Sequence, residues 1–242
     1  MRLVFVRHAE PDYENDSLTE KGFREAEILK ERLKRWKIDA FYSSPLGRAY
    51  LTGKPTLESF DQEAEILGWL KEFHFFIDDP ITNEHHAPWD FYPEFWTRQD
   101  LLYDRNDWYK HEIFNSIPEY GEAVKKLRID MDELLSRYGY NREGSFYRFS
   151  DALPVEESEK TLVFFGHLGS NMEAIGYLLG ISPLVLQQTI FLPTSSLTIL
   201  NTEMRINRAA MFRAQCFGDV SHLIEAGEKL SRMGGFFSVQ DN

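Results

Sequence analysis

The sequence is poor in cysteine and in long apolar runs. Cys216 is the only cysteine among 242 residues, which excludes an intramolecular disulfide and argues against a cysteine-based metal site. No apolar run approaches the roughly 18 residues that a membrane-crossing helix needs. The apolar start of the chain stops at Arg7, too early for a signal peptide. We therefore expect a cytoplasmic protein that does not associate with a membrane.

Positive charge is also scarce. The chain carries 27 Lys and Arg against 39 Asp and Glu, a formal net charge of -12. A phosphate backbone or an anionic membrane is held by clustered cations, so this balance argues against general binding of nucleic acid or lipid surfaces. Any site for an anion must be local. The hydrophobic fraction of 43% is ample for a folded core.

Residues 3–6 form a continuous apolar run, the pattern of a strand buried on both faces of a sheet, and another strand is clear at residues 161–165. Helical spacing between the strands predicts an α/β fold with an open, mostly parallel sheet and helices on both faces. Ligands of such sheets bind at the carboxyl ends of the strands. Further strands are expected at residues 38–42, 65–67, 196–200 and 208–217, the last two forming an antiparallel pair that turns near Glu203.

Two helices follow the first two predicted strands. The first falls between Ser17 and Trp36, where Ser17 or Thr19 can cap its start. The second is predicted to begin at Ser44, with Pro45 in the first turn. The apolar face of the first helix should contain Phe23, Ala26, Leu29 and Leu33.

Residues 73–118 interrupt the alternation of strands and helices with prolines, three tryptophans and many other aromatic side chains. We interpret this segment as a cap inserted into a single domain that spans residues 1–242. Most of its aromatic side chains should pack against each other and against the domain. A minority could line a pocket for a small molecule.

Polar side chains with the chemistry of a phosphate site follow three of the predicted strands. Arg7 and His8 end the first strand, His167 ends the strand at 161–165, and the helix after the second strand carries Arg48. Parallel strand ends become neighbours, so two imidazoles and two guanidiniums can converge. Arginine presents a fork of donors that matches phosphate oxygens. One neutral histidine can then attack phosphorus while the other stabilises the charge that develops on the oxygens.

These motifs together resemble the histidine phosphatase superfamily, also called phosphoglycerate mutase-like. The first match runs over residues 2–53 and includes RHAE at 7–10, LTEKG at 18–22 and SSPLGRAYLT at 43–52. It resumes at Gly166 and His167, with a fainter echo at residues 221–223. The resemblance leaves the segment 73–118 unexplained.

The resemblance implies a role for each matching residue. His8 corresponds to the histidine that becomes phosphorylated, Arg7 and Arg48 to the phosphate-binding arginines, and His167 to the second histidine of the pocket. The family's general acid lies in a Leu-x-Glu context, which Glu72 fits. The resemblance implies neither a cofactor nor a metal. Other acidic candidates in the same region are Asp78, Asp79 and Glu84.

The sequence departs from the family at three positions. Ala9 and Leu168 stand where relatives usually have glycine after each histidine. Relatives also carry an asparagine shortly after the nucleophile, for which Asn15 is the candidate here, as a substrate contact.

The remaining histidines give weaker signals. His85 and His86 beside Glu84 suggest metal ligands, but adjacent residues seldom reach one ion together. We interpret His222 as structural, and His74 and His111 carry no pattern.

The residues of this site are compatible with three functions. The first is a phosphomonoester hydrolase that acts on a small phosphorylated metabolite through phosphorylated His8. The second is a phosphoglycerate-type mutase, which returns the phosphoryl group to another oxygen of its substrate and must exclude water. The third is a catalytically silent module that binds phosphorylated ligands. The sequence leaves the physiological substrate and the oligomeric state open.

Overall fold

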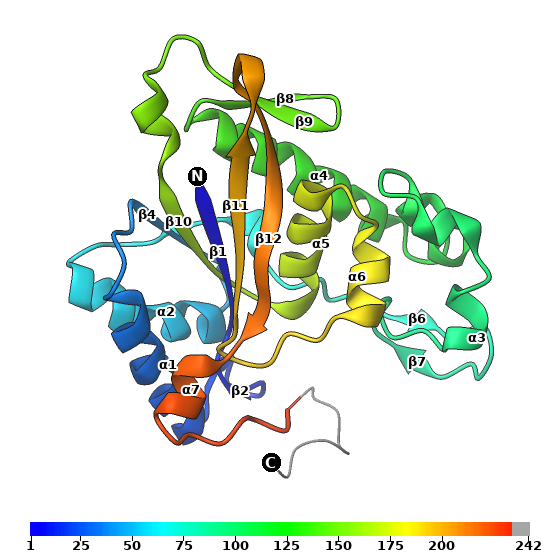
Figure 1. The fold of residues 1–242 in the computed structure, drawn as a ribbon. Coiled ribbons are helices and arrows are strands. Elements are labelled where there is room, and N and C mark those ends of the chain that lie inside the picture. The colour runs from blue at the N-terminus through cyan, green and yellow to red at the C-terminus, as the bar shows by residue number, and fades with distance from the viewer. Residues whose placement is uncertain (234–242) are drawn as a thin grey trace.

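An eight-stranded sheet forms the centre of the molecule (Figure 1). The structure is a computed structural model that describes residues 1–233. In order from one edge to the other, the strands are β5 (Glu65–Ile66), β4 (Ala40–Ser43), β10 (Thr161–Gly166), β1 (Arg2–Arg7), β11 (Leu197–Met204), β12 (Ala209–Asp219), β9 (Phe146–Phe149) and β8 (Tyr140–Glu143). The first four of these strands run parallel to one another, and the remaining pairings are antiparallel.

The sheet confirms the predicted α/β class and is more mixed than the sequence indicated. The strands β11 and β12 form the predicted antiparallel pair, but the turn comes later than the predicted position near Glu203, which lies within β11 and pairs with Met211. In the turn, Asn207 and Arg208 have positive φ. The hairpin of β8 and β9, which the sequence analysis did not identify, turns at Gly144 with a φ of 61°. Short turns can join only antiparallel strands, so these two hairpins make half of the sheet antiparallel.

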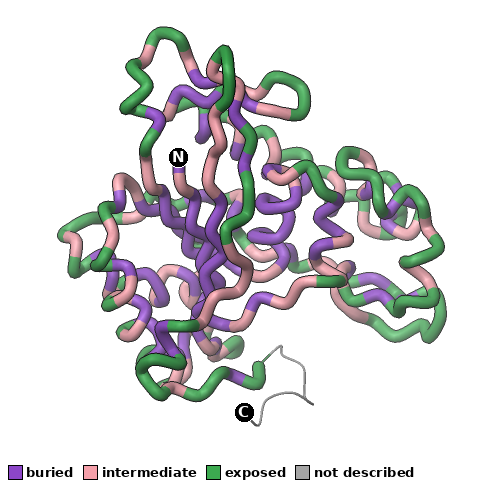
Figure 2. Tube along the Cα trace, in the orientation of Figure 1, coloured by how far each residue is buried: buried purple, intermediate pink, exposed green. Residues whose placement is uncertain are grey.

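Helices cover both faces of the sheet, as predicted. Side chains of α1 (Glu20–Leu33) and α2 (Gly47–Phe60) pack on one face, where β1 contributes Val4 and Val6. Side chains of α4 (Pro118–Ser136) and α5 (Leu168–Leu179) pack on the other face, against Leu3 and Phe5. The central strands are therefore buried from both sides, as the purple trace in Figure 2 shows. This burial accounts for their unbroken apolar sequence.

The first helix begins where the sequence predicts, but one of its expected core residues lies outside the core. Thr19 is the N-cap, and its hydroxyl accepts a hydrogen bond of 3.1 Å from the backbone N–H of Gly22. Phe23 is 45% exposed, so its assignment to the apolar face is wrong. Gly22 faces inward instead, because the helix approaches the carbonyl of Glu10 so closely that a Cβ would lie 2.2 Å from that oxygen.

The second helix begins later than predicted. It starts at Gly47 with Leu46 as N-cap, so Pro45 is not in its first turn and the capping role given to Ser44 is wrong. The Ser44 hydroxyl instead accepts from the N–H of Leu46, at 3.2 Å. The first helical N–H, on Gly47, donates to the carboxylate of Asp16 at 2.7 Å. A carboxylate from a distant loop therefore takes the place of a local cap.

The segment 73–118 has little regular structure. It contains the two-stranded sheet of β6 (Ile77–Asp78) and β7 (His85–His86), the short helix α3 (Pro93–Trp96) and three 3₁₀ turns. Trp108 and Phe114 are buried against each other and against Tyr120 of α4. Most of the segment's aromatic rings thus serve packing, as expected from their density.

Candidate active site

Two histidines meet at the carboxyl end of the parallel strands. The pairing of β1 with β10 places Arg7 opposite Gly166, so His8 and His167 follow neighbouring strand ends. Their ring centroids lie 5.2 Å apart, and the rings are inclined by 58°. Both side chains are almost completely buried. The sheet therefore brings together two imidazoles that lie far apart in the sequence.

The ring of His8 is held in one tautomer. Its Nδ1 lies 2.9 Å from the carbonyl oxygen of Ala9, and because a carbonyl can only accept, Nδ1 carries the proton. The backbone N–H of Glu10, in the same peptide group as this carbonyl, donates to the Glu25 carboxylate at 2.9 Å and helps to fix the carbonyl. Burial, together with the positive charges of Arg7 and Arg48, lowers the pKa of His8 to about 3. At neutral pH the ring is uncharged, with a free electron pair on Nε2.

The ring of His167 is anchored by a hydroxyl. Its Nε2 lies 2.8 Å from Oγ of Ser44, which follows β4. Its Nδ1 is buried and has no hydrogen-bond partner within residues 1–233. Burial lowers the pKa of His167 well below its ordinary value, and the neighbouring His8, Arg48 and Arg7 lower it further. Nδ1 is thus the atom available to a ligand.

Both predicted arginines lie beside the histidines and keep donors free. Arg7 is buried and donates from Nη1 to the carbonyl of Leu192, at 2.6 Å. Arg48 donates from Nη1 to Asp16, at 2.6 Å. The Nε of each guanidinium is buried without a hydrogen-bond partner among the described residues. A buried N–H without a partner is costly, and a phosphate oxygen would satisfy it.

The carboxylate of Glu72 lies against the first turn of α5. It accepts hydrogen bonds from the backbone N–H groups of Gly169 at 3.2 Å and Ser170 at 3.1 Å. Burial raises the pKa of Glu72, although these N–H groups and the charge of Arg7 act in the opposite direction. A raised pKa favours the protonated form that a general acid requires.

The competing acidic residues are engaged elsewhere. Asp78 lies 3.0 Å from His85, and Asp79 lies 3.1 Å from His86, both across the hairpin of β6 and β7. Glu84 contacts the hydroxyl of Tyr92 at an exposed position in that hairpin. Within residues 1–233 there is no group of three or more His, Cys, Asp and Glu side chains that could hold a metal ion.

The side chain of Asn15 is held within its own loop. It is exposed, and its amide donates to Asp12 of the same loop at 2.8 Å. Tyr13 from this loop lies closer to the chemistry, with its ring 6.3 Å from the ring of His8 and 5.4 Å from Cζ of Arg48. No pattern in the sequence indicates Tyr13, Asp16 or the role of Ser44 as partner of His167, because each depends on contacts between distant segments.

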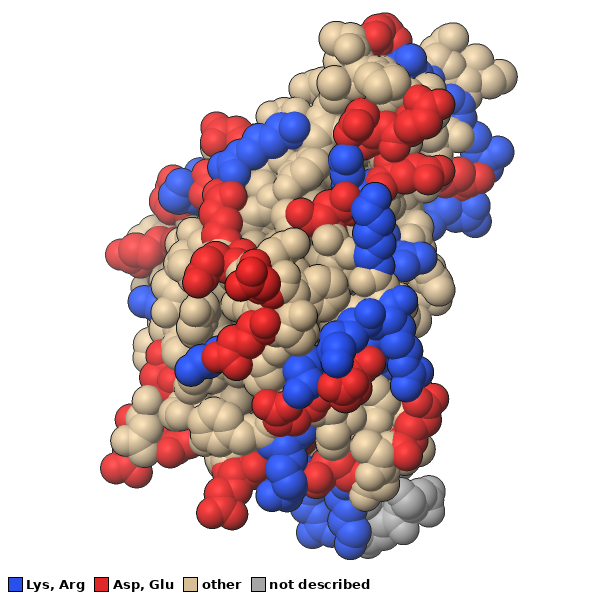
Figure 3. All heavy atoms as spheres, turned by 90° about the vertical axis from the view of Figure 1, so that its left-hand side faces the viewer, with Lys and Arg blue, Asp and Glu red and all other residues tan. Residues whose placement is uncertain are grey.

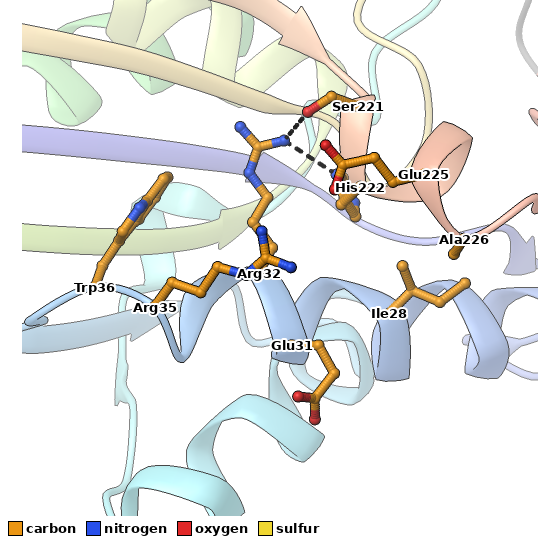
Figure 4. Close-up of a pocket in the computed structure, with 9 residues that line it drawn as sticks. All are labelled: Ile28, Glu31, Arg32, Arg35, Trp36, Ser221, His222, Glu225 and Ala226. Atoms are coloured by element: carbon orange, nitrogen blue, oxygen red, sulfur yellow. Dashed lines mark hydrogen bonds between the residues drawn. The ribbon is translucent and has the colours of Figure 1, made fainter.

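His222 lies on the far side of α1 from the second helix, in α7 (Ser221–Glu225). A surface hollow of about 550 Å³ separates α7 from α1, and the guanidinium of Arg32 points across it toward Ser221 and His222 (Figure 4). Arg32 is also paired with Asp219, so its charge is already compensated. These contacts agree with the structural role expected of His222.

Comparison with known proteins identifies the class of this chain. The family model described as histidine phosphatase superfamily (branch 1) matches residues 3–135. The chain therefore belongs to the histidine phosphatase superfamily.

Two curated relatives match part of the chain. Phosphoserine phosphatase 1 of Hydrogenobacter thermophilus is 35% identical over 98 residues, which are 37% of this chain and 41% of the relative. The 2,3-bisphosphoglycerate-dependent phosphoglycerate mutase of Thermoplasma acidophilum is 37% identical over 70 residues, 25% of this chain and 35% of the mutase. The matches thus span less than half the length of either relative.

Solved structures extend the likeness of fold over nearly the whole chain. A phosphoserine phosphatase variant of Entamoeba histolytica in complex with phosphoserine has a TM-score of 0.57 at 21% identity, covering 92% of this chain and 98% of that one. A mycobacterial glucosyl-3-phosphoglycerate phosphatase has a TM-score of 0.57 at 19% identity, covering 90% and 98%. The structure also contains no helix, within residues 1–233, that is long and apolar enough to cross a membrane.

Proposed function

We propose that this protein is a phosphomonoester hydrolase that acts through a phosphohistidine formed on Nε2 of His8. The contact between Nδ1 of His8 and the carbonyl of Ala9 carries this proposal. It keeps the proton on Nδ1, so that the electron pair on Nε2 is available for attack. The low pKa of His8 keeps the ring uncharged across the physiological range.

The first half-reaction transfers the phosphoryl group to His8. Arg7 and Arg48 hold the phosphate oxygens, and His167 donates to one of them from Nδ1. Nε2 of His8 forms a bond to phosphorus while the bond from phosphorus to the ester oxygen breaks. Glu72, protonated in the free enzyme, gives its proton to the leaving alcohol.

The second half-reaction restores the enzyme. The carboxylate of Glu72 takes a proton from a water molecule, whose oxygen attacks phosphorus as the bond to Nε2 breaks. Inorganic phosphate leaves, His8 is again neutral, and Glu72 is again protonated. No cofactor takes part in this scheme.

The substrate class follows from charge. Lys and Arg are interleaved with Asp and Glu over the face shown in Figure 3, and the chain as a whole has a net charge of -12. Such a surface favours a small phosphorylated metabolite, which needs only local cations, over nucleic acid. We place this chemistry in the cytoplasm and assign residues 73–118 the role of a cap over the strand ends.

The mutase remains the second candidate, because one of the two curated relatives is a phosphoglycerate mutase. The two reactions share the first half-reaction and differ in the acceptor of the phosphoryl group. With a phosphoglycerate as substrate, release of inorganic phosphate identifies a hydrolase. Formation of the isomer without free phosphate identifies a mutase.

Turnover of p-nitrophenyl phosphate tests the proposal. The wild-type protein should hydrolyse this ester, and His8→Ala should lose at least about a thousandfold in kcat because the nucleophile is removed. His85→Ala, at an exposed position on β7, is the matched control and should retain wild-type turnover. Equal turnover by the wild type and His8→Ala would refute the proposal.

A further inference from the structure

Three aromatic rings from separate segments surround the candidate site. The ring of Tyr13 lies near His8 and Arg48, at the distances given above. The half-buried ring of Phe191, from the loop before β11, lies 5.6 Å from Cζ of Arg7. Trp89, from the segment 73–118, lies against Gly169, two residues after His167.

Trp89 lies directly beside Glu72. A Cβ built on Gly169 would lie 2.9 Å from two carbons of the Trp89 ring and 2.8 Å from Oε1 of Glu72. Only glycine at position 169 permits the ring and the carboxylate to approach the same point. Because Glu72 must give its proton to the leaving oxygen, Trp89 is placed where the alcohol part of the substrate has to lie.

The charges around the site favour an alcohol without a negative group. The cations that act on His167 are Arg48 and Arg7, and the phosphoryl group itself uses both arginines. The carboxylate of Asp16 lies beside Arg48 and would repel a second anion.

Lysines near Glu72 in sequence or space do not change this balance. Lys71 and Lys126 line a hollow of about 310 Å³, to which Glu72 also contributes. Arg7, His8 and His167 do not line that hollow. A carboxylate on the substrate would therefore compete with the phosphoryl group for Arg7 and Arg48, the cations that act on both histidines.

We infer, on the basis of the proposed function, that the preferred substrate is a phosphate monoester whose alcohol is uncharged and apolar, and that Tyr13, Trp89 and Phe191 form its binding rim. Aromatic rings bind such a group by stacking and by removing apolar surface from water. Hydrolysis of this ester yields the neutral alcohol and inorganic phosphate. A carboxylated ester such as phosphoserine should be a poorer substrate.

A comparison of three alkyl esters tests the inference. Alkyl esters are chosen because an aryl leaving group would raise the rate without any help from binding. We expect kcat/KM for 2-phenylethyl phosphate to exceed that for ethyl phosphate by about tenfold or more, and that for phosphoserine by a larger factor. In Trp89→Ala and Phe191→Ala, the ratio between 2-phenylethyl and ethyl phosphate should fall toward one.

Trp96→Ala is the matched control, because Trp96 is half-buried in the same segment and packs against Tyr103. It should leave the ratio at the wild-type value. A higher kcat/KM for phosphoserine than for 2-phenylethyl phosphate would overturn the inference and leave the proposed hydrolase intact. A ratio that neither Trp89→Ala nor Phe191→Ala changes would overturn it as well. Failure to hydrolyse any ester would instead refute the proposed function, and the inference with it.

Discussion

The hydroxyl of Ser44 lies 2.8 Å from Nε2 of His167 and also accepts a hydrogen bond from the N–H of Leu46. A serine hydroxyl can accept two hydrogen bonds and donate one, so the bond from Leu46 leaves its proton available to Nε2 of His167. We infer that Nε2 accepts this proton and that the proton of the neutral imidazole lies on Nδ1. In that tautomer His167 can donate to a phosphoryl oxygen.

Ser44→Ala should therefore lower kcat by about tenfold, the cost of one hydrogen bond that orients a catalytic group. Ser44→Thr, which keeps the hydroxyl, should restore most of the loss. Nitrogen NMR of the imidazole should show the proton on Nδ1 of His167 in the wild type and a mixture of tautomers in Ser44→Ala. A wild-type ring protonated on Nε2 would contradict this role for Ser44.

Glu72→Gln should separate the two half-reactions. With an alkyl phosphate, kcat should fall by about a hundredfold or more, because the leaving alcohol needs a proton. With p-nitrophenyl phosphate, whose leaving group needs none, one equivalent of nitrophenol should appear in a burst. Slow turnover should follow the burst, since the water then lacks its base.

The pH profile gives a second measure of Glu72. The acid form is the active one in the free enzyme, so kcat/KM for alkyl esters should fall as the pH rises through the pKa of Glu72. This alkaline decline should disappear in Glu72→Gln. Glu84→Gln, at the exposed end of the hairpin of β6 and β7, should behave as wild type. A burst-free, uniform loss with both kinds of ester would argue against Glu72 as general acid.

Arg48→Lys should be a poor replacement although it conserves charge. A lysine ammonium cannot present two parallel donors to phosphate and cannot reproduce the contact that holds Arg48 to Asp16. We expect kcat/KM to fall by about a hundredfold, with weaker inhibition by inorganic phosphate. Arg98→Lys, at an exposed position in the segment 73–118, is the control. Wild-type kinetics for Arg48→Lys would show that charge alone is sufficient.

The buried histidines should make the fold sensitive to acid. The native pKa of His8 is about 3, whereas an unfolded histidine has a pKa of about 6.5. Between pH 6.5 and pH 3 the histidine is protonated in the unfolded chain but not in the folded one. The free energy of unfolding therefore falls as the pH decreases over this range. For His8 alone the loss between pH 7 and 4 is about 3 kcal/mol.

Urea denaturation at pH 7 and pH 4 measures this loss. In His8→Gln the decrease in the free energy of unfolding should be smaller than in the wild type by about that amount. His85→Gln, which changes an exposed histidine, should show the wild-type decrease. Equal acid sensitivity in His8→Gln and the wild type would show that His8 is not held neutral by the fold.

The sequence predicted those parts of the site that depend on the course of single strands. Continuous apolar runs identified β1 and β10, and the position of His8 and His167 after them follows from the rule that parallel strand ends meet. The predicted start of α2 at Ser44 was wrong, because a serine followed by a proline has the local pattern of a helix cap. The actual cap, Asp16, acts on Gly47 from 31 positions away.

Contacts between segments were beyond the reach of the sequence. The pairing of Ser44 with His167 and the approach of Trp89 to Glu72 depend on how three or more segments pack. Neither leaves a periodic pattern along the chain. Likewise, Phe23 follows the helical period of α1, yet the close approach of Gly22 to Glu10 turns another face inward.

Direct detection of the phosphoenzyme tests the central claim, that Nε2 of His8 accepts the phosphoryl group. The protein is mixed briefly with a ³²P-labelled phosphate ester, denatured in base and digested. We predict label that is stable in base, labile in acid and confined to the peptide with His8, with more of it in Glu72→Gln. Turnover without any such label, or label that persists in His8→Ala, would contradict the account.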